Sequence, residues 1–214
     1  MIKTIGAAAL IASLLASTAM ADSAGAPSEG KMNLKARLGY MSITGSGQYT
    51  GSLSQPGSKA VTDPKLAQKN GAIVELAANY FVANNVALEG SIGYGRSREE
   101  AKDSTTSLAG KNLSIIPLTA LVQYHIMPEA SVSPYVGVGY SYQFMSGGSD
   151  TLKRKNGGNA VGQIGVDFAF NDTMGFNIDV KHTLKTNHDV KIGSTTTKMK
   201  LATTTVMAGV TFPF

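Results

Sequence analysis

The sequence contains no cysteine and no tryptophan, and beyond residue 21 it contains no apolar run of about 18 residues. Without cysteine there is no disulfide, so an exported domain with this sequence must be held together by extensive backbone pairing or by a good core. Without a long apolar run, the chain beyond residue 21 offers no membrane-spanning helix.

The first 21 residues form a segment of their own. Lys3 is followed by a short apolar stretch, and the segment ends on small residues, with Ala19 and Ala21 in the positions of a cleavage site. This order is typical of a secretory signal peptide, and the apolar stretch is too short for a spanning helix of roughly 20 residues. We therefore predict a signal peptide over residues 1–21, cleaved after Ala21.

From there on the dominant sequence period is two. Residues 22–32 are small and polar and are expected to form a flexible periplasmic lead-in, and the alternation begins at residue 33. Alternation of this kind is typical of strands. It recurs in eight segments, each near the roughly 9 to 11 residues with which a tilted strand crosses a bilayer. The segments begin near residues 33, 72, 86, 113, 132, 160, 175 and 199.

The connections between these segments alternate between short and long. Short links are expected at residues 83–85, 127–131 and 171–174, and long loops rich in Gly, Ser, Thr and Lys at residues 44–71, 96–112, 145–159 and 185–198. The polar face of the strands carries mostly small uncharged groups, which fit a narrow interior, whereas the apolar face suits lipid. We predict an all-β fold over residues 33–214: an eight-stranded antiparallel up-and-down transmembrane β-barrel with short periplasmic turns and four long extracellular loops. A soluble, secreted eight-stranded barrel is the alternative.

Three stretches carry a family resemblance: "YFVANNVALEG", "IIPLTALVQYHIMPEASVSPYVGVGYSYQF" and "GQIGVDFAFNDTMGFNIDVKHTLKTNHDVKIG". In order and spacing they resemble the OmpW family of small outer-membrane barrels, from about residue 72 to residue 214. The resemblance implies a barrel in the outer membrane of a Gram-negative type of cell that passes small hydrophobic compounds, which can leave sideways into the bilayer. Some relatives also serve as receptors for phage or bacteriocins.

The chain departs from the family pattern at two places. The double proline that usually enters the fourth strand is reduced to Pro117, and Leu201–Thr205 stands where the family commonly has an Asp-Pro-Trp stretch. Contacts that the family assigns to tryptophan are therefore not expected in this chain.

The alternation predicts that even-numbered residues face lipid and odd-numbered residues face the lumen. Charged lumen residues gather at one height near the turn end, where a narrow barrel brings them into contact and requires them to pair. The predicted lumen floor consists of Lys35, Arg37, Glu75, Glu89, Asp167, Asp179 and Lys181. It is interpreted either as a gate or as a fixed polar core.

Toward the loop end the lumen face becomes apolar. An apolar vestibule, open to the outside above the charged floor, is predicted from Met41, Ile43, Ile73, Ile115, Val161 and Leu201. Such a vestibule favours the entry of small apolar solutes and resists free passage of ions. The alternative is a hydrophobic core that stiffens the upper barrel.

The last strand ends on an apolar alternation of Val210, Phe212 and Phe214. These side chains are expected to face lipid at the periplasmic rim and to act as an assembly signal for the barrel-assembly machinery. Pro213 is tolerable there because it lies at a strand end. The long loops carry more Lys and Arg than Asp and Glu, so they are expected either to contact lipopolysaccharide phosphates or to form a solvated loop set.

Catalysis is not expected. There is no cysteine, no Gly-x-Ser-x-Gly elbow and no metal-ligand spacing, and the three histidines, His125, His182 and His188, are poorly placed for a triad. We predict no catalytic residue, metal or cofactor, and no nucleic-acid partner, because the basic residues are not interleaved with stacking aromatics. The expected function is a narrow channel for small hydrophobic compounds; the alternative is a structural or surface-interaction barrel with a permanently packed lumen.

Overall fold

The computed structural model describes residues 29–46, 52–53, 61–62, 65–68, 70–102, 107–108, 112–147, 152–154, 156–184, 186–192 and 195–214. Every regular element in these ranges is a β-strand. None of them contains a helix that is long and apolar enough to cross a membrane. The predicted cleavage site at Ala19 and Ala21 lies outside the described residues, as does the lead-in up to residue 28.

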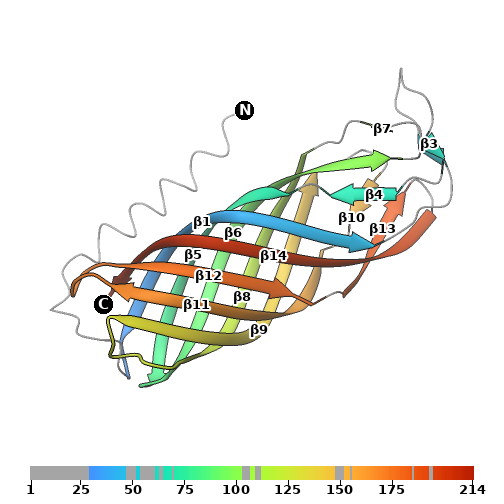
Figure 1. Cartoon of the computed structure of the whole chain (residues 1–214). Coiled ribbons are helices and arrows are strands. Elements are labelled where there is room, and N and C mark those ends of the chain that lie inside the picture. Colours follow the sequence, from blue (N-terminus) through green and yellow to red (C-terminus); the bar gives the residue numbers. More distant parts are fainter. Residues whose placement is uncertain are drawn as a thin grey trace, which may run out of the picture.

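Eight strands form the wall of the molecule: β1 (Met32–Ser46), β5 (Gly71–Ala83), β6 (Val86–Lys102), β8 (Asn112–His125), β9 (Val132–Gly147), β11 (Gly157–Ala169), β12 (Gly175–Thr183) and β14 (Thr195–Pro213). They pair in this order, antiparallel throughout. The last strand returns to the first and pairs with it from Asn33↔Pro213 to Ser46↔Lys200. In Figure 1 β1 and β14 accordingly lie side by side although they are the first and last strands of the chain. The predicted eight-stranded antiparallel barrel is confirmed.

Burial alternates along these strands with the period that the sequence predicts. In β8, for example, each odd-numbered residue from Leu113 to His125 is buried, whereas the even-numbered residues between them are mostly exposed. Large apolar side chains at even positions, such as Leu38, Val138 and Ile164, are exposed around the outer wall. In water such a surface would be unfavourable, but in a bilayer the lipid tails cover it.

The two ends of the barrel differ. At one end, the turn end, successive strands are joined by residues 84–85, 126–131 and 170–174, and the C-terminus lies at the same end (Figure 1). At the opposite end, the loop end, the predicted loops contain short strands: β4 (Lys65–Gln68), β7 (Ser107–Leu108), β10 (Leu152–Arg154) and β13 (Thr186–Ile192) extend the sheet, and β2 (Ser52–Leu53) pairs with β3 (Val61–Thr62).

The chain segment before the first strand is attached at the turn end. The Gly30 N–H donates to the carbonyl of Phe81, 2.8 Å away, and the Phe81 N–H donates to the carbonyl of Lys31. Gly30 has φ of 86°, a left-handed conformation that glycine adopts without strain. Residues 29–31, the described part of the predicted lead-in, are therefore bonded to the barrel, and Met32 already belongs to β1.

Candidate functional site in the barrel lumen

The predicted floor residues lie in the lumen near the turn end, where they form one hydrogen-bonded network. All are buried except Asp167, whose side chain is 15% exposed. They come from five strands, because neighbouring strands place their odd-numbered residues on the same inner face. The Lys35, Arg37, Glu75, Glu89, Asp167, Asp179 and Lys181 side chains thus meet although they are spread over 147 positions of the chain.

Arg37 is the centre of this network. Its Nη1 lies 2.6 Å from Oε1 of Glu75, and its Nη2 lies 2.8 Å from Oε2 of Glu89. Its Nε donates to Oδ1 of Asn177 at 2.7 Å. The planar guanidinium therefore donates hydrogen bonds to side chains of three strands. The single ammonium group of a lysine lacks this fixed arrangement of donors.

Lys181, on β12, reaches the same two glutamates. Its Nζ lies 2.9 Å from Oε1 of Glu75 and 2.8 Å from Oε1 of Glu89, and it donates to Ser91 Oγ at 3.2 Å. Glu75 and Glu89 are thus each shared between Arg37 and Lys181. Such sharing is what makes buried charge tolerable, since an ion taken out of water is costly unless it is paired.

The third cation is closer to the turn end. Lys35 Nζ lies 2.8 Å from Oδ2 of Asp167 and 4.7 Å from the centre of the Tyr135 ring. Asn177 links this pair to the rest of the network, because its Nδ2 donates to Oδ1 of Asp167 at 2.8 Å while its Oδ1 accepts from Arg37. The remaining carboxylate, Asp179, accepts from the Tyr135 hydroxyl at 2.9 Å and from Gln163 Nε2 at 2.6 Å.

Several neutral side chains complete the floor. Gln163 also donates to Glu89, and Gln123 donates to Glu89 and to Gln163. Asn79 donates to Gln123. All of them, like Tyr135 and Asn177, stand at odd positions. The alternation therefore predicts Asn79 and Gln123 at the height of the floor, whereas Gln163, Tyr135 and Asn177 were not predicted there.

Above the floor, the predicted vestibule residues Met41, Ile43, Ile73, Ile115 and Val161 are buried in the lumen. The side chain of Leu201, the sixth, lies outside the described residues, although its backbone pairs with Gly45 in β1. A cavity of ≈ 30 Å³ lies here. Since one water needs roughly 10–15 Å³ by this measure, the space holds a few waters at most.

The cavity has two kinds of wall. Met41, Ile73, Ile115 and Val161 line it together with Pro117, and Glu75 and Lys181 of the floor also reach it. The rest of the lining is uncharged and polar: Thr119, Ser141, Gln143, Thr183, Thr203 and Thr205. The upper lumen is therefore amphipathic rather than uniformly apolar as the sequence predicted.

The hydrogen-bond ladder between β6 and β8 is interrupted next to this cavity. Strands β6 and β8 pair from Val86↔Tyr124 to Ile92↔Leu118 and again from Gly95↔Ile115, but the two positions between have no pairing partners in this ladder. Pro117 stands in the gap, and it has no N–H with which to form a ladder hydrogen bond. The sequence rule that identifies proline as a poor residue for an inner strand thus locates a gap in this ladder.

The three C-terminal residues predicted as an assembly signal lie on β14 or directly after it. Val210 is 38% exposed on the outer face, and Phe212 and Phe214 are half-buried. The Phe214 N–H donates to the Met32 carbonyl at 2.7 Å, and the Met32 N–H donates to the Phe214 carbonyl at 3.1 Å. The last residue is therefore part of the seam that closes the barrel.

The histidines with described side chains have structural surroundings. His125 is buried between the rings of Phe81 and Tyr135, each at a centroid distance of 4.9 Å. Its ring nitrogens face Ser133 and Gln123, each at 3.3 Å. His182 lies on the outer wall and bonds to Thr204. Among the described residues, no group of three His, Asp or Glu side chains is arranged to hold a metal ion.

Comparison with known proteins gives a consistent result. The model of the OmpW family matches residues 28–214. A Rickettsia typhi protein named as a candidate outer membrane protein is 35% identical over 209 residues, covering 87% of this chain and 83% of its own length. An "uncharacterized outer-membrane protein" of Sinorhizobium fredii is 30% identical over 159 residues, covering 70% and 69%.

Solved structures share the fold. The crystal structure of the outer membrane protein OprG from Pseudomonas aeruginosa superposes with a TM-score of 0.70 at 18% identity, covering 90% of this chain and 99% of that one. The solid-state NMR structure of the outer membrane protein AlkL gives a TM-score of 0.64 at 21% identity, covering 91% and 94%. At these identities the likeness is one of architecture.

Proposed function

The chain belongs to the OmpW family of outer-membrane barrels, and on that premise we propose that it forms a narrow channel for small hydrophobic compounds. The chain is a protein of the outer membrane. In such barrels the short turns face the periplasm and the longer loops face outward. Solutes would therefore enter the upper lumen from the loop end and leave through the wall beside Pro117.

The floor supports a path that does not continue along the barrel axis. Arg37 and Lys181 together bridge Glu75 and Glu89 across the lumen at 2.6 to 2.9 Å. An apolar solute that passed through would have to separate these ion pairs and leave charges without partners, at a cost of several kcal/mol per ion. A side exit avoids that cost.

The gap in the β6–β8 ladder is the observation that supports a side exit. It is adjacent to the upper-lumen cavity, because Pro117 and Ile115 line that cavity and also border the gap. Opening the wall at this point breaks fewer backbone hydrogen bonds than opening an equal length of the continuous part of the same ladder. In lipid each unsatisfied backbone group costs several kcal/mol. The apolar side of the cavity leads to this part of the wall.

A proline replacement tests this exit. Pro117→Ala supplies the missing N–H and allows the β6–β8 ladder to close, so we expect the initial rate of uptake of N-phenyl-1-naphthylamine into the outer membrane of intact cells to fall about threefold. Pro134→Ala, at the turn-end part of β9 where the ladder with β11 is continuous, is the matched control and should leave the rate unchanged. Equal rates for the wild type and Pro117→Ala, at equal amounts of folded barrel, would remove the side exit from the mechanism.

A second candidate is a structural or surface-interaction barrel with a permanently packed lumen, in contact with lipopolysaccharide, phage or bacteriocin. The observation that favours it is the small size of the upper cavity, ≈ 30 Å³, which is below the volume of small-molecule sites, about 300–1,000 Å³. Under the channel proposal the upper lumen widens to admit a solute, whereas under the second candidate it does not. An uptake rate equal to that of cells without the protein would favour the packed barrel.

We further propose that Val210, Phe212 and Phe214 serve assembly by the barrel-assembly machinery after export with a signal peptide ending at Ala21. The paired backbones of Phe214 and Met32 support a role for the terminus in closing the sheet. Deleting Phe214 is expected to reduce the folded barrel in the outer membrane several-fold, because the seam loses its last pair. The heat-dependent shift of the folded barrel in gel electrophoresis measures this, and an unchanged folded fraction would contradict it.

A catalytic role is not part of the proposal. The ring of His125 is enclosed by aromatic rings, and its second nitrogen meets the Gln123 amide rather than a carboxylate. His182 is bonded to Thr204 on the outer wall. These surroundings differ from the hydrogen-bonded Ser, His and Asp of a hydrolase.

A further inference from the structure

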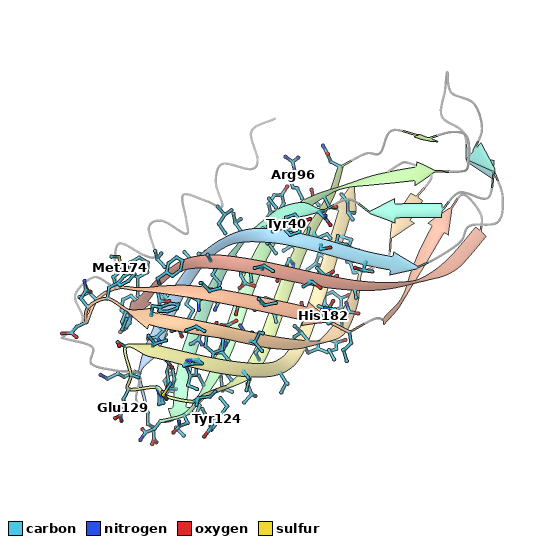
Figure 2. All side chains as sticks on the ribbon, viewed as in Figure 1. Tyr40, Arg96, Tyr124, Glu129, Met174 and His182 are labelled. Carbon is cyan, nitrogen blue, oxygen red and sulfur yellow. The ribbon has the colours of Figure 1, made fainter. Side chains whose placement is uncertain are left out.

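A cavity that the channel does not use lies below the floor, at the turn end. It has a volume of ≈ 320 Å³ and lies between the turn after β8 (residues 126–131) and the turn after β11 (residues 170–174). Figure 2 labels Glu129 and Met174 on these two turns, at the same end of the barrel. The volume is at the lower end of the range for small-molecule sites.

Two buried oxygens of the cavity lining lack hydrogen-bond partners. Asn33 on β1 and Thr211 on β14 both line the cavity and are each 5% exposed. Neither Asn33 Oδ1 nor Thr211 Oγ1 has a partner within the described part of the chain. Buried polar atoms are almost always hydrogen-bonded, so these two oxygens are acceptors that a water or a ligand donor in the cavity can satisfy.

The charge of the cavity is of one sign. Glu129, Asp167 and Asp172 line it, and none of its lining residues, all of them described, is Lys, Arg or His. Lys35 approaches Asp167 from the floor side at 2.8 Å and compensates part of that charge. Asp167 Oδ1 also accepts from Asn177, but an ionised carboxylate has about four acceptor sites, so this one can accept further donors.

Part of the remaining lining is apolar and part is polar. Phe168, Phe170 and Met174 line the cavity together with Pro128 and Pro213, and Ser131, Ser133 and Asn171 line it as well. A ligand that fits this lining has an apolar body and a compact, positively charged end with several N–H donors. A quaternary ammonium has the charge but no N–H, whereas a primary ammonium has three donors.

We propose that this periplasmic cavity is a binding site for small molecules with a primary ammonium group on an apolar body. The ammonium lies among Asp167, Asn33 and Thr211 and donates to their oxygens, and the apolar body packs on the apolar part of the lining. The site is on the opposite side of the floor from the proposed side exit. Binding at this site therefore requires no passage of solute through the lumen. The binding proposal and the channel proposal can each be correct without the other.

Benzylamine is the probe that tests the site. We expect saturable shifts in the amide NMR signals of residues 126–131 and 170–174 when the full-length barrel in lipid nanodiscs is titrated with benzylamine. Benzyl alcohol, which keeps the ring and loses the charge, should bind at least about tenfold more weakly. Benzyltrimethylammonium, which keeps the charge and loses the N–H donors, should bind about threefold more weakly.

Variants locate the site. Asp167→Asn should weaken benzylamine binding about fivefold. Because Asp167 also pairs with Lys35, a second variant avoids the floor: Glu129→Gln with Asp172→Asn, both on exposed turns, should weaken binding about threefold through lost long-range attraction. Glu29→Gln is the matched control, since Glu29 is an exposed carboxylate at the same end but does not line the cavity.

Three results would overturn the proposal. The first is the absence of a saturable shift with benzylamine, and the second is equal affinity for benzylamine and benzyl alcohol. The third is an effect of Glu29→Gln as large as that of the double variant, since this would mean that the amine responds to the general charge of the turn end rather than to the cavity.

Discussion

The lower and the upper lumen of this barrel are both lined by odd-numbered residues of the same strands. The side chains that fill the two halves differ in kind. In the lower lumen, Arg37 and Lys181 hold Glu75 and Glu89 in a network of charged hydrogen bonds. In the upper lumen, apolar and hydroxyl side chains leave a small cavity beside a gap in the β6–β8 ladder. The lower half is closed by paired charge, and the upper half is closed only by packing.

This difference matters because the two kinds of closure respond differently to change. A buried ion pair resists rearrangement, since each partner left alone costs several kcal/mol. Uncharged side chains around a cavity can change rotamer at a cost of about 1 kcal/mol. If the barrel moves to admit a solute, we expect the movement in the upper lumen.

The largest expected effect is on stability and comes from the floor. Arg37→Met removes the cation shared by Glu75 and Glu89, and we expect it to lower the free energy of unfolding by about 3–5 kcal/mol, measured by urea unfolding in lipid vesicles. Arg96→Met, at an exposed position of β6, is the control and should change it by less than about 0.5 kcal/mol. A loss at Arg37 no larger than the loss at Arg96 would mean that the floor is not held by its charges.

A smaller effect on stability, but a rise in uptake, is expected in the upper lumen. Ile115 is 1% exposed and lines the cavity, so Ile115→Ala should cost about 2–5 kcal/mol, toward the lower end if the cavity relaxes. Because it enlarges the space beside Pro117, it should also raise N-phenyl-1-naphthylamine uptake about twofold. Ile164→Ala, on the lipid-facing wall, is the control. Unchanged uptake in the Ile115 variant would favour the permanently packed barrel.

The alternation of side chains made the fold and the lumen face predictable from the sequence. The spacing of two assigns Lys35, Glu75 and Lys181 to one inner surface without any knowledge of contacts. The alternation also predicted that the last strand, β14, pairs with the first, β1. In a membrane the backbone groups of both edge strands must be paired, and eight antiparallel strands achieve this when the sheet closes on itself.

The pairings inside the lumen were not predictable in the same way. Lys35 bonds to Asp167, 132 residues away, and Lys181 bonds to Glu75, 106 residues away. Which residues meet depends on the tilt and shear of the strands, and a sequence pattern does not contain these quantities. The hydroxyl side of the upper lumen, which includes Thr183, Thr203 and Thr205, was missed although these residues stand at odd positions. The turn-end cavity was missed because part of its lining comes from turns, whose side chains follow no period of two.

The central claim is that the charged floor closes the barrel axis in the assembled protein. Ion conductance through the purified wild-type barrel in planar lipid bilayers tests this claim most directly. Ions need a continuous aqueous path along the barrel axis and cannot leave through an opening that leads into lipid. The account predicts currents that are small and close to those of the bare bilayer. Large, steady, ohmic currents would contradict it.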